Sequence, residues 1–115
     1  MRLTMTFEQW SVVVVPFPFA DRDAQRRRPA VVLSNQREFG ASAGHSVLAM
    51  VTSAVHSRWP LDVVISDLTA AGLSASSVIR MKLFIRDNRL IQRQVGALGA
   101  QDREAVRKAL ETLLG

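Results

Sequence analysis

The sequence lacks several residues and motifs on which common kinds of chemistry depend. It contains no cysteine, which excludes a disulfide scaffold, a thiolate metal site and a cysteine nucleophile. It also lacks the His-x-Glu and His-Glu-x-x-His metal motifs, the P-loop and any glycine-rich phosphate turn, so we expect no metal and no cofactor. No apolar run approaches the roughly 20 residues of a membrane span, and residues 1–10 lack the apolar core of a signal peptide. We therefore expect a cytoplasmic protein with no membrane partner.

Acidic side chains are outnumbered by basic ones. The net charge is +5 and the sequence pI is about 11.3, and Lys82 and Lys108 are the only lysines among 15 basic residues. Arginine stays charged in proteins and binds phosphate through two parallel hydrogen bonds. This balance indicates a nucleic acid or an acidic protein as the partner. The alternative is that the arginine excess reflects a GC-rich genome.

The chain has the length of one domain, which we place at residues 10–115 after a short leader at residues 1–9. Short β-branched runs separated by turn residues predict a mainly β (α+β) fold, a small antiparallel barrel of five to six strands. A C-terminal helix is expected from Ala100 to Gly115, with one apolar stripe. The expected strands are Val12–Pro16, Pro29–Ser34, Ser46–Thr52, Leu61–Ser66, Ser77–Ile85 and Leu90–Val95. The expected stripe consists of Val106, Ala109, Leu110, Leu113 and Leu114.

The segment Val12–Ser34 organises the chain, because it contains two buried strands around a polar loop that ends in Arg26-Arg27-Arg28. Arg28 lies where the loop re-enters the sheet, so its backbone is held while its side chain can reach outward. Thr52-Ser53 ends the third strand beside another loop. Arg80 lies in an otherwise apolar strand and must face solvent or a partner across a cleft. Alternatively, the arginine triplet is only a run of charges in contact with water, and Arg80 points outward through the ordinary alternation of side chains along a strand.

The two histidines, His45 and His56, are candidates for acid–base work, although neither has the spacing of a metal ligand. The alternative is that both are surface residues without a role. Arginines and hydroxyls without a metal suit RNA cleavage, because RNA carries its own nucleophile, the 2′-hydroxyl. The same arginines could also bind phosphate without any chemistry.

Three segments resemble the MazF/PemK-like toxin endoribonucleases of type II toxin–antitoxin modules. That family's pattern reads Gly-Asp, an apolar strand, Pro-Phe-Pro-Phe-Thr-Asp, a variable loop and Arg-Arg-Pro-Ala-Val-Val-Leu-Ser, which Val12–Ser34 closely matches. Met50–Ser53 (MVTS) is similar to the second signature, and Ser77–Ile85 (SVIRMKLFI) to the third. The resemblance covers the chain from Trp10 onward.

The resemblance implies an SH3-like barrel with a terminal helix, working as a homodimer. It implies metal-independent cleavage of single-stranded RNA, leaving a 2′,3′-cyclic phosphate. By their match to the family's signatures, Arg28 and Thr52 would be the principal catalytic pair, and Arg80 the general acid or phosphate stabiliser. The acidic cognate antitoxin would cover the arginine loop. We expect RNA or antitoxin contacts from Asp23, Gln25, Arg26, Arg27, Ser53, His56 and Lys82.

The chain departs from the family pattern at two places. Trp10-Ser11 replaces Gly-Asp before the first strand. Lys82 occupies the position of an aspartate that follows the catalytic arginine in the PemK branch, so Asp23 or His56 would have to act as the base.

Two competing functions remain. The first is a non-catalytic growth inhibitor that binds a protein target, as the gyrase poison CcdB does on the same barrel. The second is a basic nucleic-acid-binding module without chemistry. Its weakness is the scarcity of stacking platforms, since the chain has no tyrosine and only two tryptophans, Trp10 and Trp59.

Overall fold

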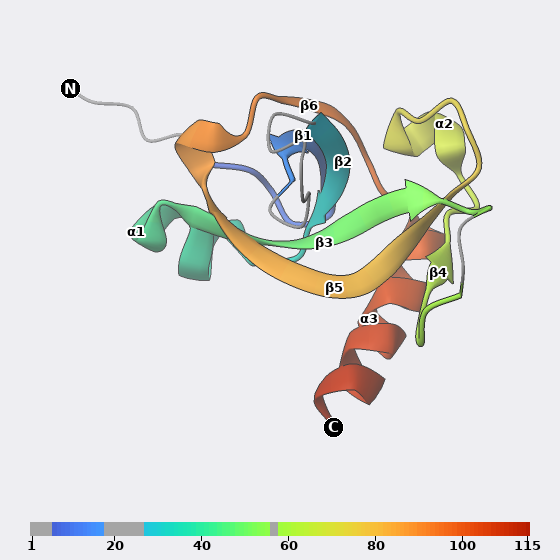
Figure 1. The fold of residues 1–115 in the computed structure, drawn as a ribbon. Helices are drawn as coiled ribbons and strands as arrows, with labels where there is room; N and C mark the ends of the chain where they lie inside the picture. The colour runs from blue at the N-terminus through green and yellow to red at the C-terminus, as the bar shows by residue number, and fades with distance from the viewer. Residues whose placement is uncertain (1–5, 18–26, 56–57) are drawn as a thin grey trace.

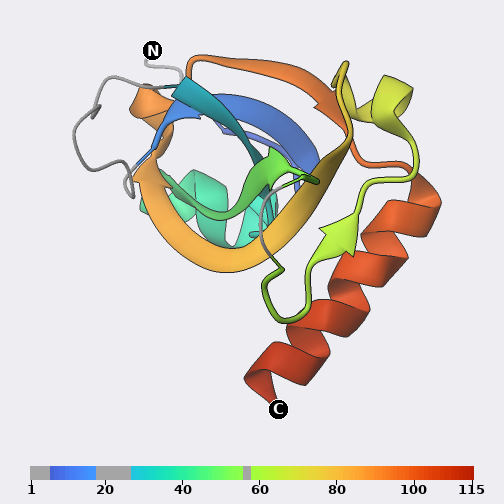
Figure 2. The same cartoon turned by 45° about the vertical axis from the view of Figure 1, so that its right-hand side comes forward.

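A computed structural model describes residues 6–17, 27–55 and 58–115, and within them the main feature is one curled antiparallel sheet. Its strands lie in the order β4-β5-β3-β2-β1-β6. The sheet bends into a half-barrel, as Figures 1 and 2 show. The strands are β1 (Ser11–Pro16), β2 (Arg27–Val32), β3 (His45–Ser53), β4 (Val63–Val64), β5 (Ser77–Asp87) and β6 (Arg93–Ala97). The expected antiparallel β fold with a C-terminal helix is confirmed.

Within the described residues, four helices or helical turns precede the long C-terminal helix. They are η1 (Gln36–Gly40), α1 (Ala41–Ala43), α2 (Leu68–Ala71) and η2 (Asn88–Leu90), and the long helix is α3 (Ala100–Leu114). We expected a plain connection where α2 lies. The Asp67 side chain accepts a hydrogen bond from the Ala70 backbone N–H and so caps this short helix.

The apolar runs form strands that are buried on both faces. Val13 and Val15 of β1 pack with Ala30 and Val32 of β2 in one core. The alternate residues, including Val12, Val31 and Val51, form a second core with α3. Neighbouring strand residues point to opposite faces, so a strand covered on both sides has a continuous apolar sequence.

The apolar stripe of α3 is shorter than the sequence indicated. Val106 and Ala109 are buried against the sheet, whereas Leu113 and Leu114 are 41% and 78% exposed. The C-terminal turns of the helix project away from the half-barrel (Figure 1). The prediction that these two leucines join the core stripe was wrong, because the helix extends past the sheet that it covers.

Asp102 fastens the start of α3 to the connection between β4 and α2. Its carboxylate accepts hydrogen bonds from the backbone N–H groups of Ser66 and Asp67 at 3.0 Å, and from the Ser66 hydroxyl at 2.8 Å. Burial by itself would raise the pKa of Asp102, but these three donors outweigh burial and lower it. The carboxylate is therefore held in its charged form and positions the helix.

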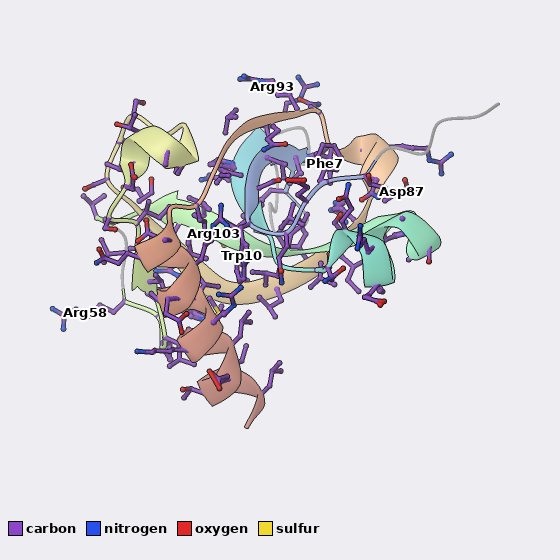
Figure 3. All side chains as sticks on the ribbon, turned by 180° about the vertical axis from the view of Figure 1, so that it is seen from behind. Phe7, Trp10, Arg58, Asp87, Arg93 and Arg103 are labelled. Atoms are coloured by element: carbon purple, nitrogen blue, oxygen red, sulfur yellow. The ribbon has the colours of Figure 1, made fainter. Side chains whose placement is uncertain are left out.

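Trp10 adopts a left-handed backbone conformation, with φ of 75°. Its N–H donates to the Val32 carbonyl, and its own carbonyl accepts from the Leu98 N–H, so the residue links β2 to the start of α3. The ring is buried, and the Arg107 guanidinium lies 5.2 Å from its centroid. Figure 3 shows Trp10 between the half-barrel and α3. Glycine suits this conformation best, which explains a Gly-Asp pair here in the family pattern.

Several strand boundaries differ from the sequence-based expectation. β4 is only two residues long instead of Leu61–Ser66, because Leu61 has φ of 67° and belongs to a turn. β6 begins at Arg93, since Asn88–Leu90 forms a helical turn. Asp87-Asn88 does not close a hairpin: β6 crosses over to pair with β1, at the far edge from β4.

Candidate functional site

Strand register places the three expected catalytic residues on one face of the sheet. Ala30 pairs with Met50 on β3, and Met50 pairs in turn with Arg80 on β5. Residues paired across strands, and residues two apart along a strand, share a face. Arg28 precedes Ala30 by two positions, and Thr52 follows Met50 by two, at the same end of the antiparallel pair. Arg28, Thr52 and Arg80 therefore share one face, toward one end of the sheet.

Arg28 is a strand residue rather than the last residue of a loop. β2 begins at Arg27, two residues earlier than expected, and Arg28 pairs with Val15 of β1. Its guanidinium lies 5.6 Å from the centre of the buried Phe17 ring, which packs edge-on against Phe84. The strand and the aromatic pair together restrict the positions that this cation can adopt.

Arg27 is exposed and lies at the end of the β1–β2 pair, opposite Pro16. The side-chain amide of Gln92 is placed with its oxygen toward Arg27, because in this orientation both the oxygen and the nitrogen of the amide have suitable hydrogen-bond partners. The Gln92 oxygen then accepts a hydrogen bond from Arg27 Nε at 2.9 Å. Arg27 and Arg28 alternate along β2 and so point to opposite faces. A ligand that lies on one face of β2 therefore cannot contact both side chains in the same way.

Thr52 and Ser53 end β3, as the sequence indicated. Thr52 is buried and pairs with Val78, while Ser53 is half-buried and pairs with Ser77. The Ser53 hydroxyl accepts a hydrogen bond from the Val55 N–H at 3.3 Å. Thr52 shares the face of Arg28 and Arg80, whereas Ser53 points to the opposite face by strand alternation.

Arg80 is buried and forms a two-point ion pair with Asp62. Its Nε donates to Oδ1 at 3.1 Å and its Nη2 to Oδ2 at 2.8 Å. Hydrogen bonding to Asp62 raises the pKa of Arg80, although burial opposes the shift. We expected this side chain to face solvent or a partner across a cleft. Instead a carboxylate of the same chain compensates its charge within the fold.

Asp62 reaches Arg80 from a tight turn that begins at Trp59. The Asp62 N–H donates to the Trp59 carbonyl at 3.2 Å, and Leu61 between them has φ of 67°. Proline at the second position and a positive φ at the third are features of a type II turn. The third position usually holds glycine or asparagine, so Leu61 is strained there.

Trp59 is 42% exposed and lies against two cations of β5. The Arg80 guanidinium is 5.6 Å from the centre of the indole, and the Lys82 ammonium is 5.7 Å from it. Arg58, next to Trp59, points outward from the molecule (Figure 3). The site thus contains an aromatic ring among basic side chains.

Four of the residues predicted from the sequence lie outside the described part of the chain: Asp23, Gln25, Arg26 and His56. Sequence reasoning missed Asp62 as the partner of Arg80, and it placed Asp62 inside a strand. A signal was present, since a charge in an apolar strand requires a compensating partner. Nothing in the local pattern indicated which acidic residue supplies it.

The fold and the site define a small β half-barrel protein with a basic, hydroxyl-bearing face suited to a phosphate-containing ligand. The model of one family, the PemK-like, MazF-like toxins of type II toxin–antitoxin systems, matches residues 8–114. The chain belongs to this family.

Solved structures show the same fold. MazF (Form-I) from Deinococcus radiodurans is 27% identical with a TM-score of 0.74, over 96% of this chain and 98% of that chain. MazE-MazF (Form-II) from the same organism is 23% identical with a TM-score of 0.73, over 96% and 97%. An endoribonuclease in complex with its cognate antitoxin from a mycobacterial species is 14% identical with a TM-score of 0.71, over 96% and 94%. No curated protein matches the chain.

The helices within residues 6–17, 27–55 and 58–115 include none long and apolar enough to cross a membrane.

Proposed function

We propose that the protein is a metal-independent endoribonuclease that cleaves single-stranded RNA, in keeping with its toxin family. The observation that carries this proposal is the register that gathers Arg28, Thr52 and Arg80 on one face of the sheet. Two arginines and a hydroxyl are suited to a phosphate that gains negative charge during a reaction. Their positions are those at which the sequence resembles the family's signatures, and the family model covers the part of the chain that contains all three.

In the proposed reaction, the 2′-hydroxyl of one nucleotide attacks the adjacent phosphorus. The new O2′–P bond forms as the P–O5′ bond breaks, which leaves a 2′,3′-cyclic phosphate and a 5′-hydroxyl. A base takes the 2′ proton and an acid returns one to the leaving 5′-oxygen. Asp23 or His56 would be that base, since Lys82 occupies the family's carboxylate position.

Each member of the set has a distinct part in this proposal. Arg28, held by β2 and by the Phe17 ring, stabilises the charged phosphorane and assists proton transfer. Thr52 donates a hydrogen bond to the scissile phosphate, whereas Ser53 points to the opposite face of β3 and does not share this contact. Arg80 adds positive charge while Asp62 fixes its direction.

The family assignment and the net charge of +5 also support a proposal about the partners of this protein. We propose that the protein acts as a homodimer in the cytoplasm. An acidic antitoxin would exclude RNA, because both would compete for Arg26, Arg27 and Arg28, of which Arg28 lies on the face of Thr52 and Arg80 and Arg27 on the opposite face. The antitoxin and the RNA are therefore alternative ligands of these arginines.

The test is cleavage of a long single-stranded RNA in the presence of EDTA, with product ends identified by mass spectrometry. Wild-type protein is expected to leave 2′,3′-cyclic phosphates, and Arg28→Ala to lose at least about 100-fold in rate, as for loss of a charge-stabilising donor. Arg37→Ala is the matched control, since Arg37 is exposed on η1 near the opposite end of β3. Absence of cleavage would refute the proposal and favour a non-catalytic inhibitor of a protein target, and equal cleavage by Arg28→Ala would refute the proposed site.

A further inference from the structure

The two tryptophans of the chain have opposite environments. Trp10 is 4% exposed inside the core, whereas Trp59 is 42% exposed on the loop before β4. A large aromatic ring contributes most to stability when it is buried, so the partly exposed ring of Trp59 contributes less through burial than Trp10 does. Ring exposure beside an RNA-cleaving face suggests contact with a ligand.

The backbone around Trp59 is fixed rather than free to relocate the ring. Asp62 holds Arg80 through two hydrogen bonds of 2.8 and 3.1 Å, and the Asp62 N–H closes the turn onto the Trp59 carbonyl. Leu61 keeps a left-handed conformation within this turn. A strained conformation persists only where its surroundings enforce it, so the indole is pre-positioned on the surface.

The neighbours of the ring are the groups that bind phosphate. Arg80 and Lys82 both approach it from β5, at 5.6 and 5.7 Å from its centre. A nucleotide presents a flat base and a charged phosphate a few ångströms apart. Aromatic rings hold unpaired bases by stacking, and arginine or lysine holds the phosphates between them.

We propose that Trp59 is a base-stacking subsite for one unpaired nucleobase of the RNA, with Lys82 on an adjacent phosphate. This inference rests on the proposed function and names the part of the substrate next to the scissile phosphate. It requires single-stranded RNA, because bases in a duplex are already stacked on one another. Stacking tolerates every base, so Trp59 contributes affinity and register along the strand rather than sequence choice.

The test uses a random-sequence RNA pool of about twelve nucleotides, long enough to fill one single-strand site. Fluorine replaces every 2′-hydroxyl, so the pool binds but cannot be cleaved. Binding to wild type is expected to quench tryptophan fluorescence, because Trp59 is exposed while Trp10 is buried. Trp59→Phe should keep binding, measured by polarisation of a labelled pool, and lose the quenching. Trp59→Ala should weaken binding roughly 5- to 150-fold.

Affinity measured over a series of salt concentrations distinguishes base stacking by Trp59 from electrostatic contact by Lys82. Lys82→Ala should reduce the slope of log affinity against log salt by about 0.7, as for one phosphate contact on a single strand, whereas Trp59→Ala should leave the slope unchanged. An abasic pool should bind Trp59→Ala and wild type equally. Thermal unfolding of each variant controls for folding, and Trp59→Phe keeps the test valid if Trp59→Ala is unstable.

The outcomes distinguish this inference from the proposed function. Wild-type cleavage of RNA together with wild-type affinity in Trp59→Ala would overturn the subsite and leave the nuclease intact. Quenching that persists in Trp59→Phe would also overturn it. If wild type neither binds nor cleaves RNA, both proposals fail.

Discussion

Replacing Asp62 by alanine should destabilise the fold by leaving Arg80 as a buried cation without its carboxylate. The two side chains keep only 10% and 17% of their surface exposed, so water cannot fully replace the two lost hydrogen bonds. Removing one partner of a buried pair costs about 3–5 kcal/mol. The pair lies just beneath the surface, which favours the lower end, about 3 kcal/mol. For a domain of this size, this loss of free energy should lower the midpoint of thermal unfolding by roughly 10 °C.

Urea unfolding followed by circular dichroism measures this loss. A second pair in the same chain supplies the control, since Arg89 and Asp87 form an equally close pair of 2.7 Å in which the Arg89 side chain is 84% exposed. Exposed pairs add little to stability, so Arg89→Ala should unfold at the wild-type urea concentration. Equal midpoints for Asp62→Ala and Arg89→Ala would show that the Arg80 pair is not buried in solution and would refute the reasoning.

A double variant separates loss of the pair from loss of the charge. Arg80→Met combined with Asp62→Leu removes both ions and fills their volume with apolar groups, which is often neutral for stability. We expect this variant to recover most of the stability lost by Asp62→Ala. Its RNA cleavage should remain strongly reduced, because the cation proposed to stabilise the phosphate is gone. Recovery of activity in the double variant would exclude that role for Arg80.

Two further predictions concern the anchoring of α3. The Asp102 pKa is lowered in the fold, so its contribution to stability is complete above the unfolded pKa and lost as pH falls through the folded pKa. Asp102→Asn should therefore unfold more easily at pH 7, by about 1–3 kcal/mol, and show a flatter loss of stability below about pH 4 in urea titrations at stepped pH. Trp10→Gly relieves a left-handed conformation that costs about 1–2 kcal/mol but deletes a buried ring that contributes about 3–5 kcal/mol. A net loss of about 2 kcal/mol is expected by calorimetry, and a gain in stability would contradict the assigned packing.

Where residues contact near neighbours in sequence, the pattern predicted the structure well. The β-branched runs at Val12–Val15 and Ala30–Leu33 became the centre of β1 and the second half of β2, since strand propensity and two-sided burial act together there. The apolar periodicity from Val106 onward predicted a C-terminal helix, and α3 is that helix. Both are cases in which a local pattern determines the element.

The errors have a common physical origin in contacts between distant segments. How far α3 is covered depends on the extent of the sheet beneath it, which periodicity along the helix does not encode, so Leu113 and Leu114 were misassigned. The expected strand Leu61–Ser66 contains β-branched residues, but the ion pair to Arg80 and the turn at Leu61 override their propensity. Helical turns at α2 and η2 were likewise too short for a periodic signal.

The candidate site also combines features that a local sequence pattern indicates with features that depend on contacts between distant segments. Strand alternation and register bring Arg28, Thr52 and Arg80 to one face, although the order of strands that does so could not be read from the local sequence. The burial of Arg80 could not be foreseen, because its partner lies 18 residues away on a turn. Roles predicted for residues in 18–26 and 56–57 stay predictions, because those residues lie outside the described part of the chain.

The position of Asp62 beside Arg80 helps to explain why the chain has Lys82 where the family pattern has an aspartate. By the resemblance to the PemK branch, a carboxylate is expected two residues after the arginine. Here that position carries a cation beside Trp59, and a carboxylate reaches Arg80 from the turn before β4 instead. Arg80 therefore has an acidic partner although the residue two positions after it is a cation. The strand position is then available for a second cation beside the indole, which gives a single-stranded RNA both a ring and a positive charge at one place.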